Sequence, residues 1–204
     1  LHKLKEINLD AIVIEKGSGV GGTWFWNRYP GARCDIESVE YSYSFSEDLQ
    51  QEWNWKEKYG TQPEILEYAR FVSKKFNLRK NINFKTSIVK ARFINNKWIV
   101  ETDNNIKIEC KYLVLATGNL STPNTPNIEG LSNFKGRIYH TGAWPEKMPE
   151  FEGRKVGIIG TGSSGVQSIP VISETAQKLL VFQRTANFSL PARHCELAEN
   201  KREN

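Results

Sequence analysis

The stretch KVGIIGTGSSGVQ, residues 155–167, decides the fold of this 204-residue chain. The apolar run from Lys155 to Ile159 predicts a buried strand, and the glycines after it form a G-x-G-x-x-G turn. A helix over Val166–Gln177 and a strand over Leu179–Gln183 are expected to follow. In this order the first glycine allows a tight turn, the second admits a pyrophosphate, and the third lets helix and strand pack closely. The sequence therefore predicts a dinucleotide-binding α/β unit, with the diphosphate on the helix N-terminus.

The second strand of this unit runs into Gln183-Arg184-Thr185 and not into an acidic residue. An acid about 20 residues beyond the last glycine binds the ribose 2′-hydroxyl of NAD, whereas an arginine there favours the 2′-phosphate of NADP. We therefore expect NADPH as the coenzyme, with Arg184 beside its 2′-phosphate. The simpler alternatives are a plain turn for the glycines and a solvated surface charge for Arg184.

A second, incomplete nucleotide unit is predicted at the start of the chain. Ala11 to Ile14 predicts a short buried strand, and Glu15 at its tip would be a ribose-binding acid. A glycine-rich turn should precede that acid by roughly 20 residues, but no glycine precedes Glu15. Either Glu15 is an ordinary acid at the end of a strand, or the first strand and its turn are missing. The first residue is not methionine, and LHKLK, residues 1–5, resembles a helix end, which favours the second interpretation.

A further buried strand is predicted over Tyr112–Ala116, and it runs into Thr117-Gly118. Small residues at such a strand end let a flavin or a nucleotide approach the backbone. One unit ending in an acid and one ending in an arginine together suggest FAD plus NADPH.

The segments between these units predict a helix, a meander and a loop. A helix is expected over Thr61–Leu78, with Thr61-x-x-Glu64 as a capping box. Short apolar runs separated by asparagine pairs predict a small antiparallel meander. Its strands are expected at Asn83–Phe93, Trp98–Thr102 and Ile106–Cys110. The aromatic-rich stretch Trp24–Ser44 has no helical period and predicts an ordered loop with short strands.

The predicted organisation is an FAD-binding domain over residues 1–130, a linker over 131–150 and the first half of an NADPH-binding domain over 151–204. The fold class is therefore α/β, with two dinucleotide-binding, Rossmann-like domains, both incomplete, and the meander inside the first.

Charge and cysteine content exclude several kinds of partner. The net charge is +5, but the basic residues are scattered and no nucleic-acid-binding motif is present. Cys34, Cys110 and Cys195 are far apart and form no C-x-x-C pair, which argues against a disulfide scaffold, a redox disulfide and a metal site. The expected setting is reducing and cytoplasmic. No apolar run approaches the roughly 18 residues of a transmembrane helix.

One further motif connects the chain to a known family. The segment FKGRIYHTGAWP fits F-x-G-x-x-x-H-x-x-x-W-P, a pattern that resembles the one distinguishing Baeyer–Villiger monooxygenases. Its residues are Phe134, Gly136, His140, Trp144 and Pro145. The resemblance extends to GGTWFWNRYPGARCDIESVEYSYSF (residues 21–45), TQPEIL (61–66) and GTGSSGVQ (160–167). It covers nearly the whole chain and is closest to the phenylacetone and cyclohexanone monooxygenase branch.

The resemblance implies a role for each motif residue. The FAD contacts that it implies are Glu15 at the ribose, Thr23, Trp24, Phe25, Trp26 and Tyr41 along the cofactor, and the Ile88 backbone at the adenine. The residues implied beside the flavin and the nicotinamide are Arg33, Cys34 and Asp35. The NADPH contacts that it implies are Gly160, Thr161, Gly162, Ser163, Ser164, Gly165, Val166 and Gln167 around the diphosphate, and Arg184 and Thr185 at the 2′-phosphate. His140 and Trp144 would couple domain motion to cofactor binding, with His140 in an architectural role.

The implied reaction inserts one oxygen atom from O2 next to a ketone carbonyl and gives an ester or a lactone, using NADPH and FAD. Asp35 would be catalytic by orienting an arginine that stabilises negative charge. The family places that arginine beyond Asn204. We therefore expect the chain to lack both the catalytic arginine and the first FAD turn, and the 204 residues alone not to oxygenate ketones. The identity of the ketone and the oligomeric state stay open.

Three other functions compete with this one. A flavin-containing monooxygenase that oxidises nitrogen or sulfur shares both nucleotide units, and Trp144-Pro145 argues against it. A disulfide reductase is disfavoured because the cysteine pair is missing. A non-catalytic NADPH-binding module fits the chain as it stands.

Overall fold

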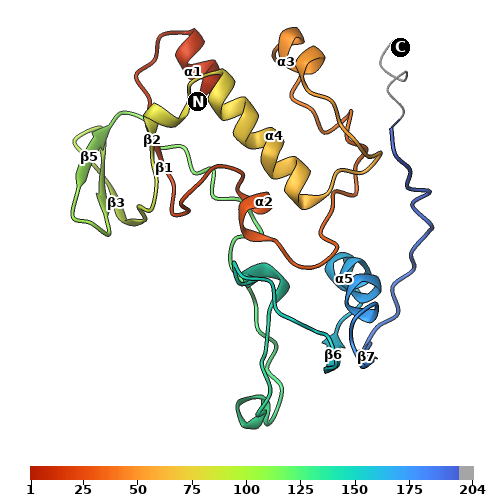
Figure 1. Cartoon of the computed structure of the whole chain (residues 1–204). Coiled ribbons are helices and arrows are strands. Elements are labelled where there is room, and N and C mark those ends of the chain that lie inside the picture. Colours follow the sequence, from red (N-terminus) through yellow and green to blue (C-terminus); the bar gives the residue numbers. More distant parts are fainter. Residues whose placement is uncertain (198–204) are drawn as a thin grey trace. The chain divides into compact units, whose positions relative to one another are not determined.

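The computed structural model describes residues 1–197, which mix helices and strands in an α/β fold, as predicted (Figure 1). The chain forms two compact units, each built from two stretches of sequence. Unit 1 comprises Leu1–Phe25 and Ala69–Ser121, and unit 2 comprises Trp26–Tyr68 and the residues from Thr122 onward. The division into domains at residues 130 and 150 that the motifs predict stays a prediction.

Unit 1 contains a short parallel strand pair and the first helix. Helix α1, His2–Glu6, confirms the helical start of the chain, and the His2 ring lies 4.2 Å from the Phe76 ring. Strand β1, Val13–Ile14, pairs in parallel with β2, Ile82–Asn83. The 3-10 helix η1, Arg79–Asn81, leads into β2. Strand β1 is shorter than predicted and only half buried, because its one partner strand covers one edge.

The predicted antiparallel meander is confirmed. It consists of β3, Ile88–Ile94, β4, Lys97–Thr102, and β5, Lys107–Cys110, paired in the order β3-β4-β5. Asn95 and Asn96 form the first turn with φ of 50° and 60°. Asparagine tolerates this left-handed region, which a two-residue hairpin turn requires at both positions.

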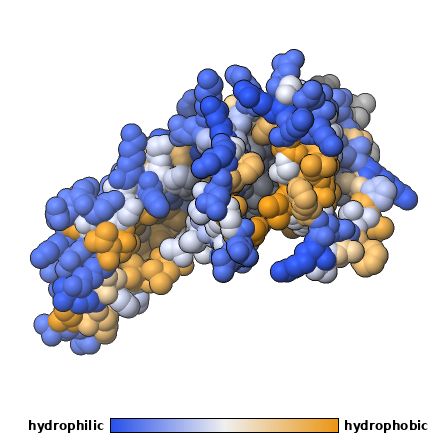
Figure 2. All heavy atoms as spheres, turned by 90° about the horizontal axis from the view of Figure 1, so that it is seen from below, coloured by the Kyte–Doolittle hydropathy of each residue, from blue (hydrophilic) through white to orange (hydrophobic). Residues whose placement is uncertain are grey.

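The prediction of a buried strand over Tyr112–Ala116 is wrong. No residue of this run lies in a strand, and Tyr112, Val114 and Leu115 are 73%, 79% and 73% exposed. A parallel strand needs backbone partners and cover on its faces, and no strand in residues 1–197 pairs with this run. Apolar atoms therefore reach the surface, and Figure 2 shows hydrophobic atoms among hydrophilic ones on one face.

The predicted helix over Thr61–Leu78 forms as α4, Gln62–Lys75. The expected capping box differs, because Glu64 Oε1 accepts the backbone N–H of Lys56, 2.7 Å away, in the loop before the helix. The Glu64 carboxylate, which the local pattern assigned to the helix N-terminus, thus binds the backbone of a preceding loop.

The stretch Trp24–Ser44 holds no strand, so the prediction of short strands there is wrong. The helical turn α2, Thr23–Trp26, opens it, and the bridge between Arg33 and Thr61 is its one strand-like pairing in the described residues. Helix α3, Glu47–Glu52, follows and was not predicted. Ser46 caps α3 by accepting the Leu49 N–H at 3.2 Å, and the Leu49 side chain is fully buried.

The predicted strand–turn–helix–strand unit is confirmed in unit 2. Strand β6, Lys155–Ile159, pairs in parallel with β7, Lys178–Phe182, and helix α5, Ser163–Ser173, connects them. Helix α5 starts three residues earlier than predicted. The strands are not buried as expected, and Ile159 and Phe182 are 65% and 55% exposed, because the sheet here has only two strands.

Candidate dinucleotide-binding site

The glycine turn between β6 and α5 has the geometry that each glycine was expected to provide. Gly160 has a φ of +101°, a region that L side chains rarely adopt. A Cβ at Gly165 would lie 2.5 Å from the Gly160 carbonyl oxygen, so the helix packs against the turn at this point. A Cβ at Gly162 would meet nothing within 4 Å. The turn is therefore crowded at Gly165 and open at the middle glycine, Gly162, where a diphosphate would approach.

The N-terminus of α5 is available to an anion. Gly162 is its N-cap residue and offers no side-chain cap. The first N–H groups of a helix lack intrahelical partners and carry partial positive charge, so they attract phosphate.

The loop after β7 is fastened to the glycine turn. Gln183 Nε2 donates to Thr161 Oγ1 at 2.8 Å, and Asn187 Nδ2 donates to the Thr161 carbonyl oxygen at 2.7 Å. Arg184 and Thr185 lie in this loop and are exposed. The hydrogen bonds therefore hold the predicted 2′-phosphate ligands beside the turn, and Asn187 is a contributor that motif spacing did not reveal.

A second loop, Tyr29–Asp35, folds as a tight turn. Ala32 N donates to the Tyr29 carbonyl oxygen at 3.1 Å, and Gly31 has a φ of +76°. The Pro30-Gly31 pair at its centre is the sequence signature of a type II turn. This signal was present in the sequence and would have predicted the turn.

Residues 32–34 of this loop pair with residues 60–62, at the start of α4. Cys34 N donates to the Gly60 carbonyl oxygen at 2.9 Å, and Gln62 N donates to the Ala32 carbonyl oxygen at 2.8 Å. These backbone hydrogen bonds run in an antiparallel sense and give the loop one register against the residues before α4.

The near side of the loop is bound by Gln167 of α5. Gln167 Oε1 accepts the Tyr29 hydroxyl at 2.9 Å and the Arg33 N–H at 3.3 Å. Gln167 Nε2 donates to the Arg33 carbonyl oxygen and to Asp35 Oδ1, both at 3.1 Å. Gln167 follows the glycine turn in the sequence, and its side chain binds Asp35. The structure therefore connects two motifs that lie far apart in the sequence.

Backbone packing reinforces this contact. A Cβ at Gly31 would lie 2.2 Å from the Gln167 carbonyl oxygen. Only glycine permits so close an approach, which makes Gly31 a site residue that the motif reading left out.

Burial sets the protonation of two groups in this loop. It raises the pKa of the Tyr29 hydroxyl, an effect opposed by a hydrogen bond with the Ser164 side chain and supported by the nearby Asp35 charge. Burial also raises the pKa of the Cys34 thiol, although the Ile36 N–H lies 3.5 Å from its sulfur. Both groups therefore stay neutral near pH 7, and Cys34 is not an activated thiolate.

Arg33 extends the site toward the end of the described chain. Its Nη1 lies 3.5 Å from Glu57 Oε2, and His194 Nε2 lies 2.8 Å from the same oxygen. Lys58 N also donates to the Cys195 carbonyl oxygen at 2.9 Å. Arg33 is thus held by a carboxylate that sequence reasoning did not identify.

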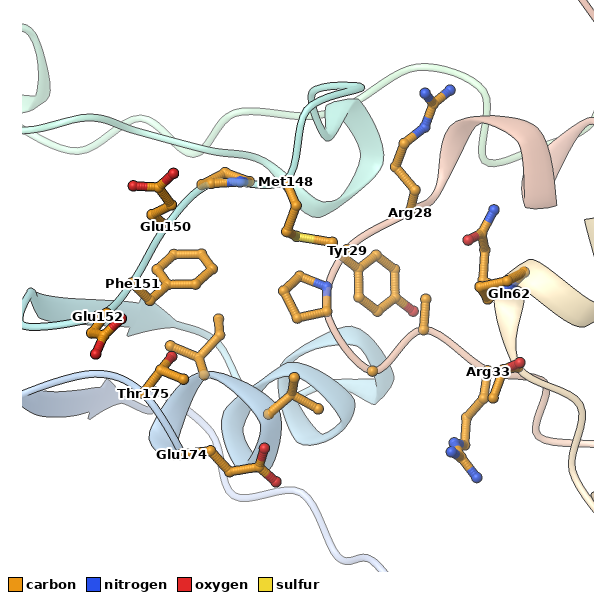
Figure 3. Close-up of a pocket in the computed structure, with 18 of the residues that line it drawn as sticks. Arg28, Tyr29, Arg33, Gln62, Met148, Glu150, Phe151, Glu152, Glu174 and Thr175 are labelled. Carbon is orange, nitrogen blue, oxygen red and sulfur yellow. The ribbon is translucent and has the colours of Figure 1, made fainter. Parts of the chain in front are cut away.

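A cavity of about 840 Å³ adjoins the Tyr29–Asp35 loop in unit 2. Figure 3 shows Tyr29, Met148 and Phe151 among the side chains that line it, with Glu150, Glu152 and Glu174 on the segments around it. The loop that carries Asp35 therefore also forms a wall of a partly apolar pocket.

Most of the predicted FAD residues lie in unit 1. Glu15 follows β1 at the carboxyl end of a parallel pair, and its Oε1 accepts the Gly17 N–H at 2.6 Å. Thr23, Trp24 and Phe25 lie in α2, which also contains Trp26. Ile88 opens β3 next to a register irregularity. Tyr41 lies in unit 2 and is exposed.

The motif of residues 134–145 follows the 3-10 helix η2, Leu131–Asn133, and contains the 3-10 helix η3, Thr141–Ala143. His140 Nδ1 accepts the Gly142 N–H at 3.0 Å, and its Nε2 lies 3.2 Å from the Asn124 carbonyl oxygen. Both ring nitrogens are thus engaged by backbone groups, which supports an architectural role for His140.

The two aromatic rings of this motif differ in burial. Trp144, followed by Pro145, is buried, and its Nε1 donates to Met148 Sδ at 3.4 Å. The Phe134 ring is exposed, and a Cβ at Gly136 would lie 2.5 Å from it. Gly136 therefore leaves room for that ring.

Within residues 1–197, no group of three or more histidine, cysteine or acidic side chains could hold a metal ion. In the same described part, no helix is long and apolar enough to cross a membrane.

The glycine turn between parallel strands, with an arginine after the second strand, defines a dinucleotide-binding α/β protein. Comparison with known families agrees, because residues 2–192 match the family described as pyridine nucleotide-disulphide oxidoreductase. The chain belongs to this family. Its cysteines are free where the structure describes them, and the sequence contains no C-x-x-C pair.

Individual relatives confirm the resemblance drawn from the motifs. The chain is 47% identical to a Baeyer–Villiger monooxygenase of Pseudooceanicola batsensis, over 94% of this chain and 35% of that protein. It is 46% identical to a phenazine N-monooxygenase of Lysobacter antibioticus, over 98% of this chain and 37% of that protein.

Solved structures give the same result. A steroid monooxygenase bound to NADP matches with a TM-score of 0.91 and 51% identity, over 97% of this chain and 38% of that one. OTEMO in complex with FAD and NADP matches with a TM-score of 0.92 and 40% identity, over 98% of this chain and 39% of that one. The chain thus spans less than two fifths of the length of each of these proteins.

Proposed function

We propose that the protein is an FAD- and NADPH-dependent monooxygenase of the Baeyer–Villiger type. Such an enzyme inserts one oxygen atom from O2 next to a ketone carbonyl to give an ester or a lactone. The observation that carries the proposal is the direct connection, through Gln167, of the glycine turn to the Asp35 loop. The turn that would bind the coenzyme and the carboxylate that would act in the reaction are thereby connected within unit 2.

The residues around the glycine turn fit NADPH. The open middle glycine Gly162 and the uncapped α5 N-terminus would take the diphosphate, with Ser163 and Ser164 in the first turn. Arg184 would take the 2′-phosphate through its guanidinium, which suits a planar, bidentate contact. Thr185, next to Arg184 in the same loop, would support that contact.

The residues of unit 1 fit one part of FAD. Glu15 follows the carboxyl end of a parallel strand, and ribose-binding acids of dinucleotide units occur at this position, which supports the proposal. We propose that α2 lines the cofactor together with Tyr41, and that the Ile88 backbone meets the adenine. When bound, NADPH supplies the hydride and FAD activates O2, while the protein supplies position, charge and exclusion of water.

Asp35 would act on a charged partner near the reacting atoms. Its Oδ1 is committed to Gln167, so the carboxylate has a fixed direction. A fixed carboxylate orients and tunes an arginine by ion pairing, and that arginine stabilises negative charge as it develops. Arg33 is engaged by Glu57, and the resemblance assigns this role to an arginine elsewhere in the enzyme.

Coenzyme choice is the first test. We expect the purified 204-residue chain to bind NADP⁺ more tightly than NAD⁺ in calorimetric titrations. Arg184→Ala should remove the preference by weakening NADP⁺ binding by about tenfold or more, as loss of a charge-assisted contact does. Lys178→Ala, which removes an exposed charge at the far end of β7, is the matched control. Equal affinity for both coenzymes in the unaltered chain contradicts the proposal.

Product analysis tests the reaction itself. The protein expressed from the complete reading frame that encodes these residues, supplied with FAD, NADPH, O2 and a ketone, should yield an ester or a lactone. A colourless protein that takes up no flavin would count against the proposal.

A second candidate, oxidation of nitrogen, is favoured by the similarity to a phenazine N-monooxygenase at 46% identity. Parallel assays with a ketone and with an aromatic nitrogen heterocycle separate the two reactions. An N-oxide formed without any ester selects this second candidate.

We further propose that both nucleotide units are Rossmann-like domains. The connection of β6 to β7 through α5 supports this for NADPH, and the pairing of β1 with β2 supports it for FAD. A reducing, cytoplasmic setting is proposed on the three unpaired cysteines of the sequence.

A further inference from the structure

We propose that Gln167 is a positioning residue, which holds the Asp35 carboxylate at a fixed place relative to the glycine turn, and is not a ligand of the diphosphate. The proposal deepens the proposed function and rests on it for the meaning of Asp35. Its structural content, one amide that locks a loop to a helix, stands on hydrogen bonds within unit 2.

The hydrogen-bonding capacity of the Gln167 side chain is fully used. A primary amide offers two N–H donors and two acceptor lone pairs. Both donors are taken, by the Arg33 carbonyl oxygen and Asp35 Oδ1, and both acceptor positions are taken, by the Tyr29 hydroxyl and the Arg33 N–H. No N–H of this side chain is left for a phosphate oxygen.

The position of Gln167 in α5 links the Asp35 loop to the predicted diphosphate site. Gln167 lies in α5, whose N-terminus forms the predicted diphosphate site, so the contact with Asp35 and that site belong to one helix. The contact at Gly31, where a Cβ would lie 2.2 Å from the Gln167 carbonyl oxygen, prevents the loop from sliding. Pairing of Cys34 with Gly60 fixes the other side of the loop.

The distance between the diphosphate site at α5 and the Asp35 carboxylate is thereby set before the coenzyme binds. Preorganisation of this kind lowers the ordering cost of binding. Without the amide, the Asp35 loop would have to be ordered on each binding event, and NADP⁺ affinity would fall.

The test replaces the amide by an isosteric carboxylate. Gln167→Glu keeps the shape of the side chain, removes both donors and places a negative charge against Asp35. Gln177→Glu makes the same chemical change at an exposed position and is the matched control. The readouts are hydrogen–deuterium exchange of a peptide covering residues 29–36 and the dissociation constant of NADP⁺.

We expect Gln167→Glu to speed exchange in residues 29–36 by about tenfold or more, which corresponds to one lost hydrogen bond to a charged group. NADP⁺ affinity should fall by a similar factor. Gln177→Glu should change neither. A Gln167→Glu protein whose loop exchange matches that of Gln177→Glu overturns the proposal.

Exchanging the amide of Gln167 and the carboxylate of Asp35 distinguishes a specific contact between them from a general loss of stability. In the double variant Gln167→Glu with Asp35→Asn, the amide at position 35 can donate to the carboxylate at position 167. Part of the lost protection in residues 29–36 should return. A double variant no better protected than Gln167→Glu alone contradicts a specific Gln167–Asp35 contact.

The two proposals fail in different ways. An unaltered protein that binds no NADP⁺ contradicts the proposed function, while the exchange measurements still decide whether Gln167 positions the loop. Retained NADP⁺ affinity in a Gln167→Glu protein with a loosened loop shows that the loop does not support the coenzyme site. This outcome overturns the proposal that Gln167 places Asp35 for the coenzyme, although Gln167 would still order the loop.

Discussion

At the scale of single residues, the site depends on side chains whose partners lie far away in the sequence. Gln167 meets Arg33 and Asp35, which are 134 and 132 positions away. Gly31 is required on two counts, by its positive φ and by the close Gln167 backbone. Small substitutions at these positions should therefore strongly affect the stability of unit 2.

Gly31→Ala should destabilise unit 2 by at least about 2 kcal/mol, since the left-handed conformation alone costs roughly 1–2 kcal/mol in an L residue and the added methyl group would clash. Gly153→Ala is the matched control, because Gly153 also has a positive φ, +66°, but open space around its Cβ position. Urea unfolding of both variants measures the difference. Equal losses would show that the close approach to Gln167 contributes nothing.

Glu64 gives a prediction about pH. Burial raises the pKa of its carboxyl above the ordinary value of 4.5, although the Lys56 N–H opposes this. Above pH 4.5 the folded state therefore binds more protons at Glu64 than the unfolded state, and the unfolding free energy falls as pH rises through that range. Glu64→Gln keeps an acceptor for Lys56 and removes the titration.

We expect Glu64→Gln to be at least as stable as the unaltered protein at pH 7, with the difference vanishing as pH falls below 4.5. Urea unfolding across this range measures it. Glu129→Gln, at an exposed position, should show no such trend. A Glu64→Gln protein that is less stable at pH 7 than at pH 4.5, relative to the unaltered chain, would contradict the sign.

At the scale of elements, patterns of nearby residues predict a strand correctly where its hydrogen-bond partners are neighbouring strands along the chain. The meander β3-β4-β5 pairs only with its own strands, and its first turn needs two residues that accept a positive φ. The run Tyr112–Ala116 is equally apolar but has no neighbouring strand in the described chain, so it does not form one.

Asn96→Ala should destabilise the meander by about 1 kcal/mol, because alanine lacks the tolerance of asparagine for the left-handed region. Asn96→Gly should be neutral or slightly stabilising, since glycine is preferred at this turn position. Hydrogen exchange of the Val100 amide, in the central strand β4, reports both effects. Equal exchange rates in the two variants would rule out a role for turn conformation.

At the scale of the whole molecule, the chain forms two compact units, and unit 2 contains the glycine turn, helix α5 and the Tyr29–Asp35 loop. A ligand that binds only the folded state stabilises it by mass action. The coenzyme should therefore report on the folding of the unit that holds the glycine turn.

NADP⁺ at 100 times its dissociation constant should raise the unfolding free energy by about 2.7 kcal/mol. NAD⁺ at the same concentration should raise it less, because it lacks the 2′-phosphate that Arg184 is proposed to bind. Urea unfolding with each coenzyme measures the shifts, and Arg184→Ala should make them equal. Equal shifts in the unaltered protein would contradict the NADP assignment.

The β6–α5–β7 unit, the meander and helix α4 could be predicted from the sequence alone. These depend on apolar periodicity and on glycine or asparagine at turns, and such signals act between residues that are close along the chain. Motif order also predicted the family. Three features became visible only in the folded chain. They are the residues that meet at the site, the bond between Glu64 and Lys56, and the absence of Tyr112–Ala116 from any sheet in the described residues. Those outcomes depend on partners brought together by folding, and no local pattern specifies a partner more than 100 positions away, as Gln167 has in Asp35.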